Sequence, residues 1–208
     1  MNRIINDTLR IFLITLIAGV LLGATYMITK DPIAKAEEDA KTEAYKEVFE
    51  DASSFSEAMD IDPSIAEMLE DEGIEGVTIN EVVAAYESED NKAPIGYCIT
   101  ATSSKGYGGD VKIVVGIRAD NTVNGISILT LNETPGLGMK AKEEVFYSQY
   151  AGKKLERFYV TKTGASREDE IDAISGATKT SNAVTNAVNG ALLYKVYILG
   201  YEINGGDN

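Results

Sequence analysis

The uncharged stretch at residues 11–29, IFLITLIAGVLLGATYMIT, constrains this chain more than any other feature. As a helix that rises about 1.5 Å per residue, it is roughly 28 Å long, close to the thickness of the hydrocarbon core of a bilayer. A cleavable signal peptide usually has a shorter apolar region followed by a small-residue cleavage site, and no convincing site precedes Lys30. The stretch therefore predicts an uncleaved membrane anchor.

We expect one domain behind this anchor, because no second apolar run of that length follows it. The predicted organisation is an N-terminal cytoplasmic segment at 1–10, a transmembrane helix at 11–29, a helical stalk and connection at 30–75, and a C-terminal domain at 76–208. The basic residues on the two sides of the span only weakly favour a cytoplasmic N-terminus with the domain outside.

Composition excludes several kinds of chemistry. The chain has no histidine, which rules out a Ser-His-Asp triad, a Cys-His pair, a histidine-ligated zinc and a c-type haem motif. Its one cysteine, Cys98, cannot form a disulfide or an iron–sulfur cluster within the chain, and we expect a buried thiol. The formal net charge of −14 disfavours nucleic-acid binding. No metal site is predicted, so any redox chemistry requires an organic cofactor.

The pattern of apolar and turn residues predicts an α+β fold, a mainly antiparallel sheet with flanking helices, preceded by one N-terminal transmembrane helix. Helices are expected at 34–48 (with Pro32 in the first turn), 64–70, 138–150 and 180–199. Strands are expected at 77–88, 94–104, 110–119, 122–132 and 155–162, and a polar loop at 163–177. Short connections favour antiparallel neighbours.

Three segments could carry chemistry: SSKGYGGDV at 103–111, LNETPGLGMKAKEEVF at 131–146 and DAISGATKTSNAV at 172–184. The first could simply be a flexible turn, and the second a strand-to-helix connection. In the third, the hydroxyls could cap the last helix through Thr178, Thr180 or Ser181. However, one cap needs only one hydroxyl, and the free N–H groups at a helix start also stabilise phosphate.

The motif DAISGATKTS resembles the flavinylation motif of FMN-binding domains in the RnfG and NqrC families. In those families the threonine that closes S-G-A-T carries FMN through a phosphoester bond. The stretches GYGG and ETPGLG are similar to two other recurrent stretches of these families and occur in the same order. The resemblance spans nearly the whole chain and is closer to RnfG, because the longer insertions of NqrC-type proteins are missing.

The resemblance implies an electron-transfer subunit of a membrane complex of the Rnf type, which couples electron transfer between ferredoxin and NAD to ion translocation. Such a subunit is part of a translocase rather than a complete enzyme. Its implied partners are the other Rnf subunits, the lipid bilayer through residues 11–29, and a magnesium-dependent flavin transferase that uses FAD. The flavin domain would lie on the extracytoplasmic side of the cell membrane. Alternatives are an NqrC-like subunit, an independent membrane-anchored flavoprotein reductase, and a cofactor-free tethered binding module.

The same resemblance implies roles for individual residues. Thr178 would be the site of covalent FMN attachment. Contacts to the ring and ribityl chain are expected from Tyr107, Gly108, Gly109, Glu133, Thr134, Pro135, Gly136, Leu137 and Gly138. Ser175 and Thr180 would hydrogen-bond the phosphate or shape the loop, and the small Gly176 and Ala177, also expected at the cofactor, would let a large partner reach Thr178. The transferase would recognise Asp172, Ser175, Gly176, Ala177 and Thr178.

Overall fold

The computed structural model describes residues 2–88 and 93–200 and divides the chain into two compact units, Met1–Thr42 and Glu43–Asn208. The first helix, α1 (Asn2–Val48), runs without a break through the apolar stretch and the predicted stalk helix. The expectation that a new helix starts after Pro32 is therefore wrong. Pro32 lies inside α1, where it removes one backbone hydrogen bond but does not end the helix. The predicted boundaries at residues 10, 29 and 75 remain predictions.

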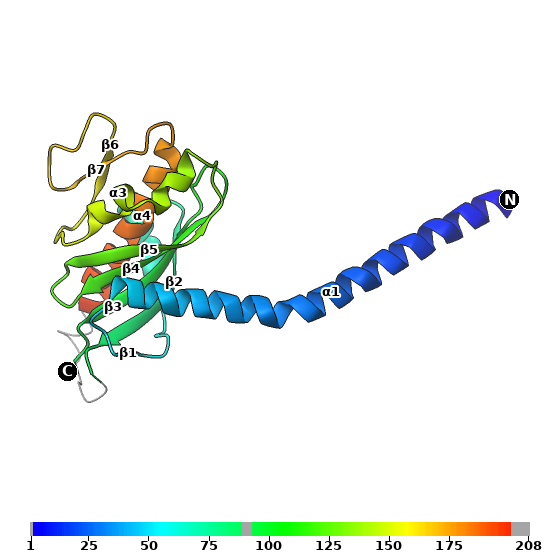
Figure 1. Cartoon of the computed structure of the whole chain (residues 1–208), viewed down its shortest axis with the longest axis horizontal. Coiled ribbons are helices and arrows are strands. Elements are labelled where there is room, and N and C mark those ends of the chain that lie inside the picture. The colour runs from blue at the N-terminus through cyan, green and yellow to red at the C-terminus, as the bar shows by residue number, and fades with distance from the viewer. Residues whose placement is uncertain (1, 89–92, 201–208) are drawn as a thin grey trace. The chain divides into compact units, whose positions relative to one another are not determined.

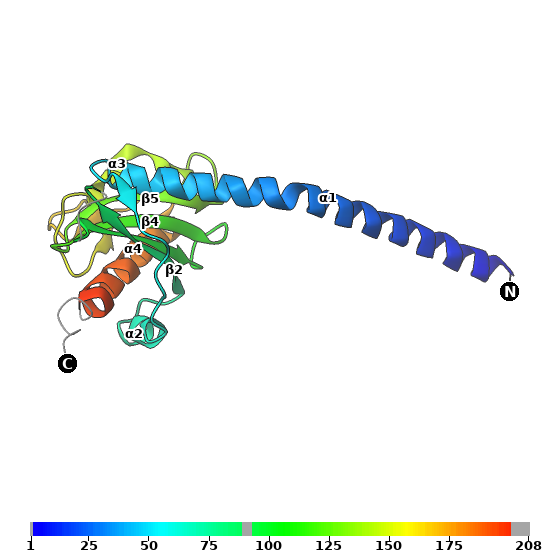
Figure 2. The ribbon, with the colours of Figure 1, turned by 90° about the horizontal axis from the view of Figure 1, so that it is seen from below.

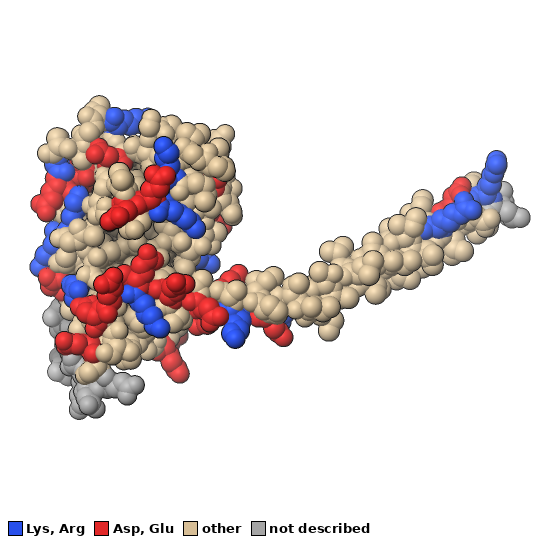
Figure 3. Space-filling model, viewed as in Figure 1, with Lys and Arg blue, Asp and Glu red and all other residues tan. Residues whose placement is uncertain are grey.

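Within the described residues, α1 is the one helix long and apolar enough to cross a membrane, a criterion that an N-terminal signal sequence also meets. Its large apolar side chains are exposed, for example 59% at Phe12, 72% at Leu22 and 77% at Met27. In Figure 3 most of this first unit carries neither acidic nor basic groups. In a water-soluble protein such an apolar surface is normally buried against other parts of the fold. A lipid bilayer can cover it instead.

The second unit is built on a five-stranded antiparallel sheet in sequential order, β1 to β5. The strands are β1 (Ser54–Phe55), β2 (Val77–Tyr86), β3 (Gly96–Ser103), β4 (Val111–Arg118) and β5 (Val123–Leu131). Short connections link β3 to β4 and β4 to β5, as antiparallel neighbours need only a hairpin, whereas the longer connection from β1 to β2 contains α2 (Ile65–Asp71). The four long strands lie within the ranges predicted from the sequence, and the α+β fold class is confirmed.

Helix α4 (Thr178–Leu193) packs against one face of this sheet, as Figures 1 and 2 show. Strand residues alternate between the two faces, so Val82 lies in the core under α4 and Val83 in the core on the opposite face. The opposite face is covered by the last turn of α1, including Val48 and the following Phe49. Cys98 lies in this second core as expected, and burial raises the pKa of its thiol.

Two glycines allow the end of α1 to come close to the sheet. A Cβ at Gly96 would lie 2.5 Å from the Phe49 ring, and one at Gly116 would lie 2.8 Å from the Val48 Cβ. Either contact is shorter than packed carbon atoms tolerate. The last turn of α1 thus completes the core of the second unit.

The remaining elements are α2 (Ile65–Asp71), η1 (Gly138–Lys142), α3 (Glu144–Tyr147), η2 (Ser148–Tyr150), β6 (Tyr159–Thr161), β7 (Glu170–Asp172) and η3 (Tyr194–Leu199). Three expectations need correction. The helix predicted at 138–150 is three short helical pieces, and the extended backbone of Glu143 (φ −82°, ψ 141°) separates the first piece from the second. The loop at 163–177 contains β7, which pairs in parallel with β6. The last helix begins two residues early and becomes π-helical at Tyr194.

Candidate functional site

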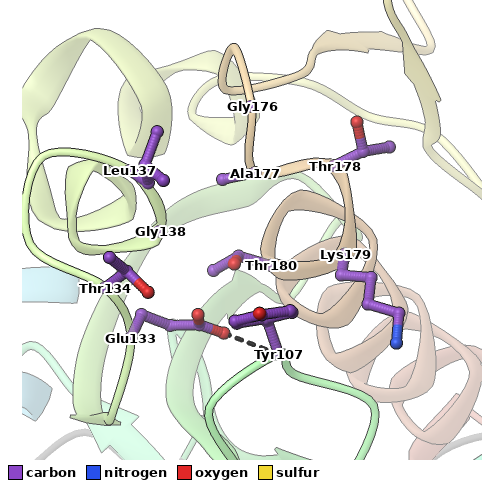
Figure 4. A pocket seen from close by; sticks show the side chains of 10 residues that line it. All are labelled: Tyr107, Glu133, Thr134, Leu137, Gly138, Gly176, Ala177, Thr178, Lys179 and Thr180. Atoms are coloured by element: carbon purple, nitrogen blue, oxygen red, sulfur yellow. Dashed lines mark hydrogen bonds between the residues drawn. The ribbon is translucent and has the colours of Figure 1, made fainter.

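A cavity of about 580 Å³ lies where the three candidate segments meet. The loop after β3, the connection from β5 into η1, and the first turn of α4 each contribute to its walls (Figure 4). Its lining residues are Tyr107, Glu133, Thr134, Leu137, Gly138, Gly176, Ala177, Thr178, Lys179 and Thr180. Residues more than 70 positions apart in the sequence therefore form one site.

Helix α4 begins without a side-chain cap. Its N-cap residue is Ala177, and no side-chain cap hydrogen bond is present, so the capping explanation for the hydroxyl cluster is wrong. The Ser181 hydroxyl instead accepts from the Ile174 N–H (3.0 Å) and donates to the Ala177 carbonyl (3.1 Å). The Thr185 hydroxyl bonds the Ser181 carbonyl and the Tyr150 hydroxyl, each at 2.8 Å. These two hydroxyls fix the start of the helix to the structure around it.

Thr178 is the first residue of α4 and is half-buried at the edge of the cavity. Figure 4 shows its hydroxyl directed away from the other lining side chains. The N–H groups of Thr178, Lys179 and Thr180 come before the first N–H that donates within the helix, which is that of Ser181 to the Ala177 carbonyl. This end of the helix therefore favours an anion near Thr178.

Thr180 lies on the inner wall and is 1% exposed, yet its hydroxyl oxygen has no hydrogen-bond partner. Beside it, Gly138 has no room for a side chain: a Cβ there would lie 2.7 Å from Thr180 Oγ1, from Glu133 Oε2 and from the Glu133 Cβ. Gly176 has φ +77°, a left-handed conformation that glycine adopts without strain. Gly138 thus allows Glu133 and Thr180 to come close to each other in the cavity wall.

Glu133 joins two of the three segments. Its Oε1 accepts a 2.8 Å hydrogen bond from the Tyr107 N–H, which holds the GYGG loop against the end of β5. Gly108 permits this approach, since a Cβ there would overlap the Asn132 carbonyl oxygen. The Tyr107 side chain is 71% exposed at the cavity edge.

Several residues predicted for the site do not line this cavity. Gly108, Gly109, Pro135 and Gly136 instead shape the two loops that approach it. Ser175 and Asp172 line a neighbouring hollow of about 380 Å³ beside α3. The Asp172 carboxylate accepts from the Ala165 N–H at 2.6 Å, and its backbone N–H donates to the Gln149 side chain at 2.7 Å. Asp172 is therefore a loop anchor in this structure.

Lys179 lines the cavity although the sequence motifs did not single it out. It is exposed, and it is the one basic residue among the described residues of the lining. Its position next to Thr178 in the motif is the signal that could have identified it, because a residue in the first turn of a helix lies near the positive helix end.

The loop between β6 and β7 is held by a carboxylate. Glu170 accepts hydrogen bonds from the backbone N–H groups of Ser166 (2.7 Å) and Arg167 (3.1 Å). These bonds favour the charged form and lower the pKa of Glu170. The loop leads directly into Asp172 and the S-G-A-T segment.

Comparison with known proteins identifies the family. The RnfG protein of the Na⁺-translocating ferredoxin:NAD⁺ oxidoreductase complex of Acetobacterium woodii is 35% identical over 183 residues, covering 86% of this chain and 85% of that protein. This chain belongs to the RnfG family. The predicted resemblance to RnfG is thus confirmed. Residues 106–193 match the family model of the FMN-binding domain.

Two further matches have lower sequence identity. The RnfG protein of the proton-translocating ferredoxin:NAD⁺ oxidoreductase complex of Clostridium ljungdahlii is 29% identical, and the match covers 92% of this RnfG chain and 91% of that one. The crystal structure of Shewanella oneidensis NqrC is 22% identical with a TM-score of 0.45, and the match covers 54% of each chain. The RnfG assignment rests on the sequence relatives.

Proposed function

We propose that this RnfG chain is the flavin-carrying electron-transfer subunit of an ion-translocating ferredoxin:NAD oxidoreductase, with FMN joined to Thr178 by a phosphoester bond. The observation that carries the proposal is the meeting of all three motif segments around one cavity, with Thr178 at its edge. The match to the FMN-binding domain covers residues 106–193 and so includes the GYGG, ETPGLG and SGAT stretches of the three segments. The names of the relatives supply the reaction class.

The cavity fits a flavin nucleotide by size and by chemistry. Its volume of about 580 Å³ lies within the range usual for small-molecule sites. The partnerless Thr180 hydroxyl is a feature that a ligand would use. When bound, FMN would supply one- and two-electron redox chemistry. Of the chain's own groups, the first-turn N–H groups of α4 would hold the phosphate, and Tyr107 and Leu137 would shield the ring from water.

The chain has no histidine that could activate Thr178 for attachment of the flavin. A threonine hydroxyl is a weak nucleophile unless a neighbouring base activates it. We therefore assign attachment to a separate flavin transferase with FAD as the donor. The Thr178 oxygen would form the new bond to phosphorus, the pyrophosphate bond of FAD would break, and AMP would leave. A phosphate tether leaves the ring system chemically unaltered and prevents loss of the cofactor.

Membrane placement is part of the proposal. Residues 11–29 of α1 would span the bilayer with residues 1–10 in the cytoplasm, and the FMN-binding domain at 76–208 would lie outside the cell membrane behind the connection at 30–75. The exposed apolar surface of α1 supports anchoring. The other subunits of an Rnf-type complex would be its partners in electron transfer.

The test is to express the full chain with a flavin transferase and to examine a denaturing gel under ultraviolet light. We expect a fluorescent wild-type band and an intact mass increased by that of FMN minus one water. Thr178→Ala should be dark, whereas the exposed loop variant Thr163→Ala should remain bright. A Thr178→Ala band as bright as wild type would refute the attachment site. Co-purification of multispanning subunits would distinguish the Rnf subunit from an independent reductase.

A further inference from the structure

Thr178 and Thr180 face opposite sides of α4. Two residues along an α-helix correspond to a rotation of about 200°. Thr178 is half-buried at the edge, with its hydroxyl directed outward in Figure 4, whereas Thr180 is 1% exposed on the inner wall. The two hydroxyls are therefore poorly placed to bond the same group of a ligand. If Thr178 carries the phosphate, Thr180 contacts a different part of the ligand.

The missing partner of Thr180 is unusual for this helix start. The neighbouring buried hydroxyls of Ser181 and Thr185 each make two hydrogen bonds. A hydroxyl removed from water without a partner destabilises the fold, so nearly all buried polar groups are bonded. Among the buried hydroxyls at this helix start, that of Thr180 is the exception, and Thr180 is a residue of the cavity lining. It is placed to bond something that enters the cavity.

A carboxylate oxygen lies beside it. Glu133 Oε1 is used by the Tyr107 N–H, and Oε2 makes no hydrogen bond within the described chain. Thr180 Oγ1 and Glu133 Oε2 are both 2.7 Å from the position that a Cβ of Gly138 would take. The cavity wall thus presents a hydroxyl, which can donate, next to a carboxylate, which accepts. A negative carboxylate at this point disfavours a phosphate and favours a neutral group that has an N–H.

We propose that Thr180 and Glu133 together bind the pyrimidine edge of the flavin ring. This edge has an N–H between two carbonyl groups, so the Thr180 hydroxyl donates to a carbonyl while Glu133 Oε2 accepts from the adjacent N–H. The assignment rests on the proposed function and replaces the expectation that Thr180 holds the phosphate. In both roles the residues orient the ring; neither forms a covalent bond.

The first measurement uses the full chain in detergent, produced without a flavin transferase. Thr180→Val removes a hydroxyl that bonds nothing, so the melting temperature should stay within about 1 °C of wild type or rise by about 2 °C. Thr185→Val is the matched control, because it removes a hydroxyl with two bonds on the same helix. Its melting temperature should fall by about 2–6 °C. A fall of Thr180→Val equal to that of Thr185→Val would show a structural role and overturn the assignment.

The second measurement uses the flavinylated chain. Thr180→Val should still give a fluorescent band on a denaturing gel, but its visible absorption bands should shift. The ratio of reduced to oxidised flavin at a fixed potential should decrease about two- to tenfold, because reduction strengthens the carbonyl as an acceptor. Thr180→Ser should behave as wild type. A bright Thr180→Val with an unchanged spectrum and ratio overturns this assignment alone, whereas a dark wild type overturns it together with the proposed function.

Discussion

Replacing Gly138 with alanine should crowd the wall of the cavity and destabilise the second unit. The new methyl group would meet three atoms at 2.7 Å, and real Cβ contacts essentially never fall below 3.0 Å. Two of these atoms, Glu133 Oε2 and Thr180 Oγ1, lie toward the ends of side chains. The third is the Glu133 Cβ, which can move only with its backbone. Some displacement of the β5-to-η1 connection is therefore required.

The expected loss of folding stability is the difference between two opposing effects of the Gly138→Ala substitution. Overpacking a well-filled site costs about 1–3 kcal/mol. Alanine also restricts the conformations of the unfolded chain, which stabilises the folded state by about 0.4–1 kcal/mol. Gly138 does not have positive φ, so no backbone strain is added. A net loss of about 1–2 kcal/mol should lower the melting temperature by about 2–8 °C in a domain of this size.

Thermal unfolding of the full chain in detergent, without flavin, measures this loss. Gly125→Ala is the control, because nothing lies within 4 Å of a Cβ at Gly125 and its φ is not positive. The control should stay within about 0.5 kcal/mol of wild type. Adding Thr180→Ala to Gly138→Ala removes one of the three contacts and should recover part of the loss. If Gly138→Ala melts at the same temperature as Gly125→Ala, the described cavity wall is wrong.

Two further predictions concern the surroundings of the site. The buried side chain of Asn189 (3% exposed) bonds both the N–H (2.8 Å) and the carbonyl (2.9 Å) of Phe158. Asn189→Ala should therefore lower the free energy of unfolding, measured with urea, by about 2–4 kcal/mol. A decrease below about 0.5 kcal/mol would contradict this prediction. The folded loop lowers the pKa of Glu170, so the ionised carboxylate stabilises the loop. This stabilisation is complete above the unfolded pKa of about 4.3 and is lost as the pH falls through the lower folded pKa. Hydrogen exchange of the Ser166 backbone amide should become faster as the pH falls through this range. Glu170→Gln should remove this pH dependence.

Local patterns predicted most of the sheet. Alternating apolar residues between turn signals locate β2 to β5, because the period of two reflects burial on strand faces. The same reasoning missed β7, where only Ile171 is buried between Glu170 and Asp172. A three-residue parallel pair depends on its distant partner β6 rather than on a local pattern. Pro32 led to the wrong start for the stalk helix, because proline normally marks a helix start or end.

The candidate site was predictable as a set of motifs but not as a surface. The motifs named nine of the ten lining residues, and the family resemblance suggested that they act together. Sequence spacing could not separate residues that face the cavity from those that shape its loops, such as Gly108 and Pro135. It also could not show that the hydroxyl of Thr180 lacks a partner while that of Ser181 is bonded, since both follow from packing across the fold. Lys179 was missed because the motif is defined by its hydroxyls and small residues.

The contact between the last turn of α1 and the sheet has a practical consequence for producing the domain without its anchor. Ala44, Tyr45, Val48 and Phe49 form half of the second hydrophobic core. A truncation that starts after Val48 would leave Val83, Cys98 and Val114 open to water, and such material should aggregate. A shortened chain should therefore begin before Glu43, retaining the end of the anchor helix as part of the folded body.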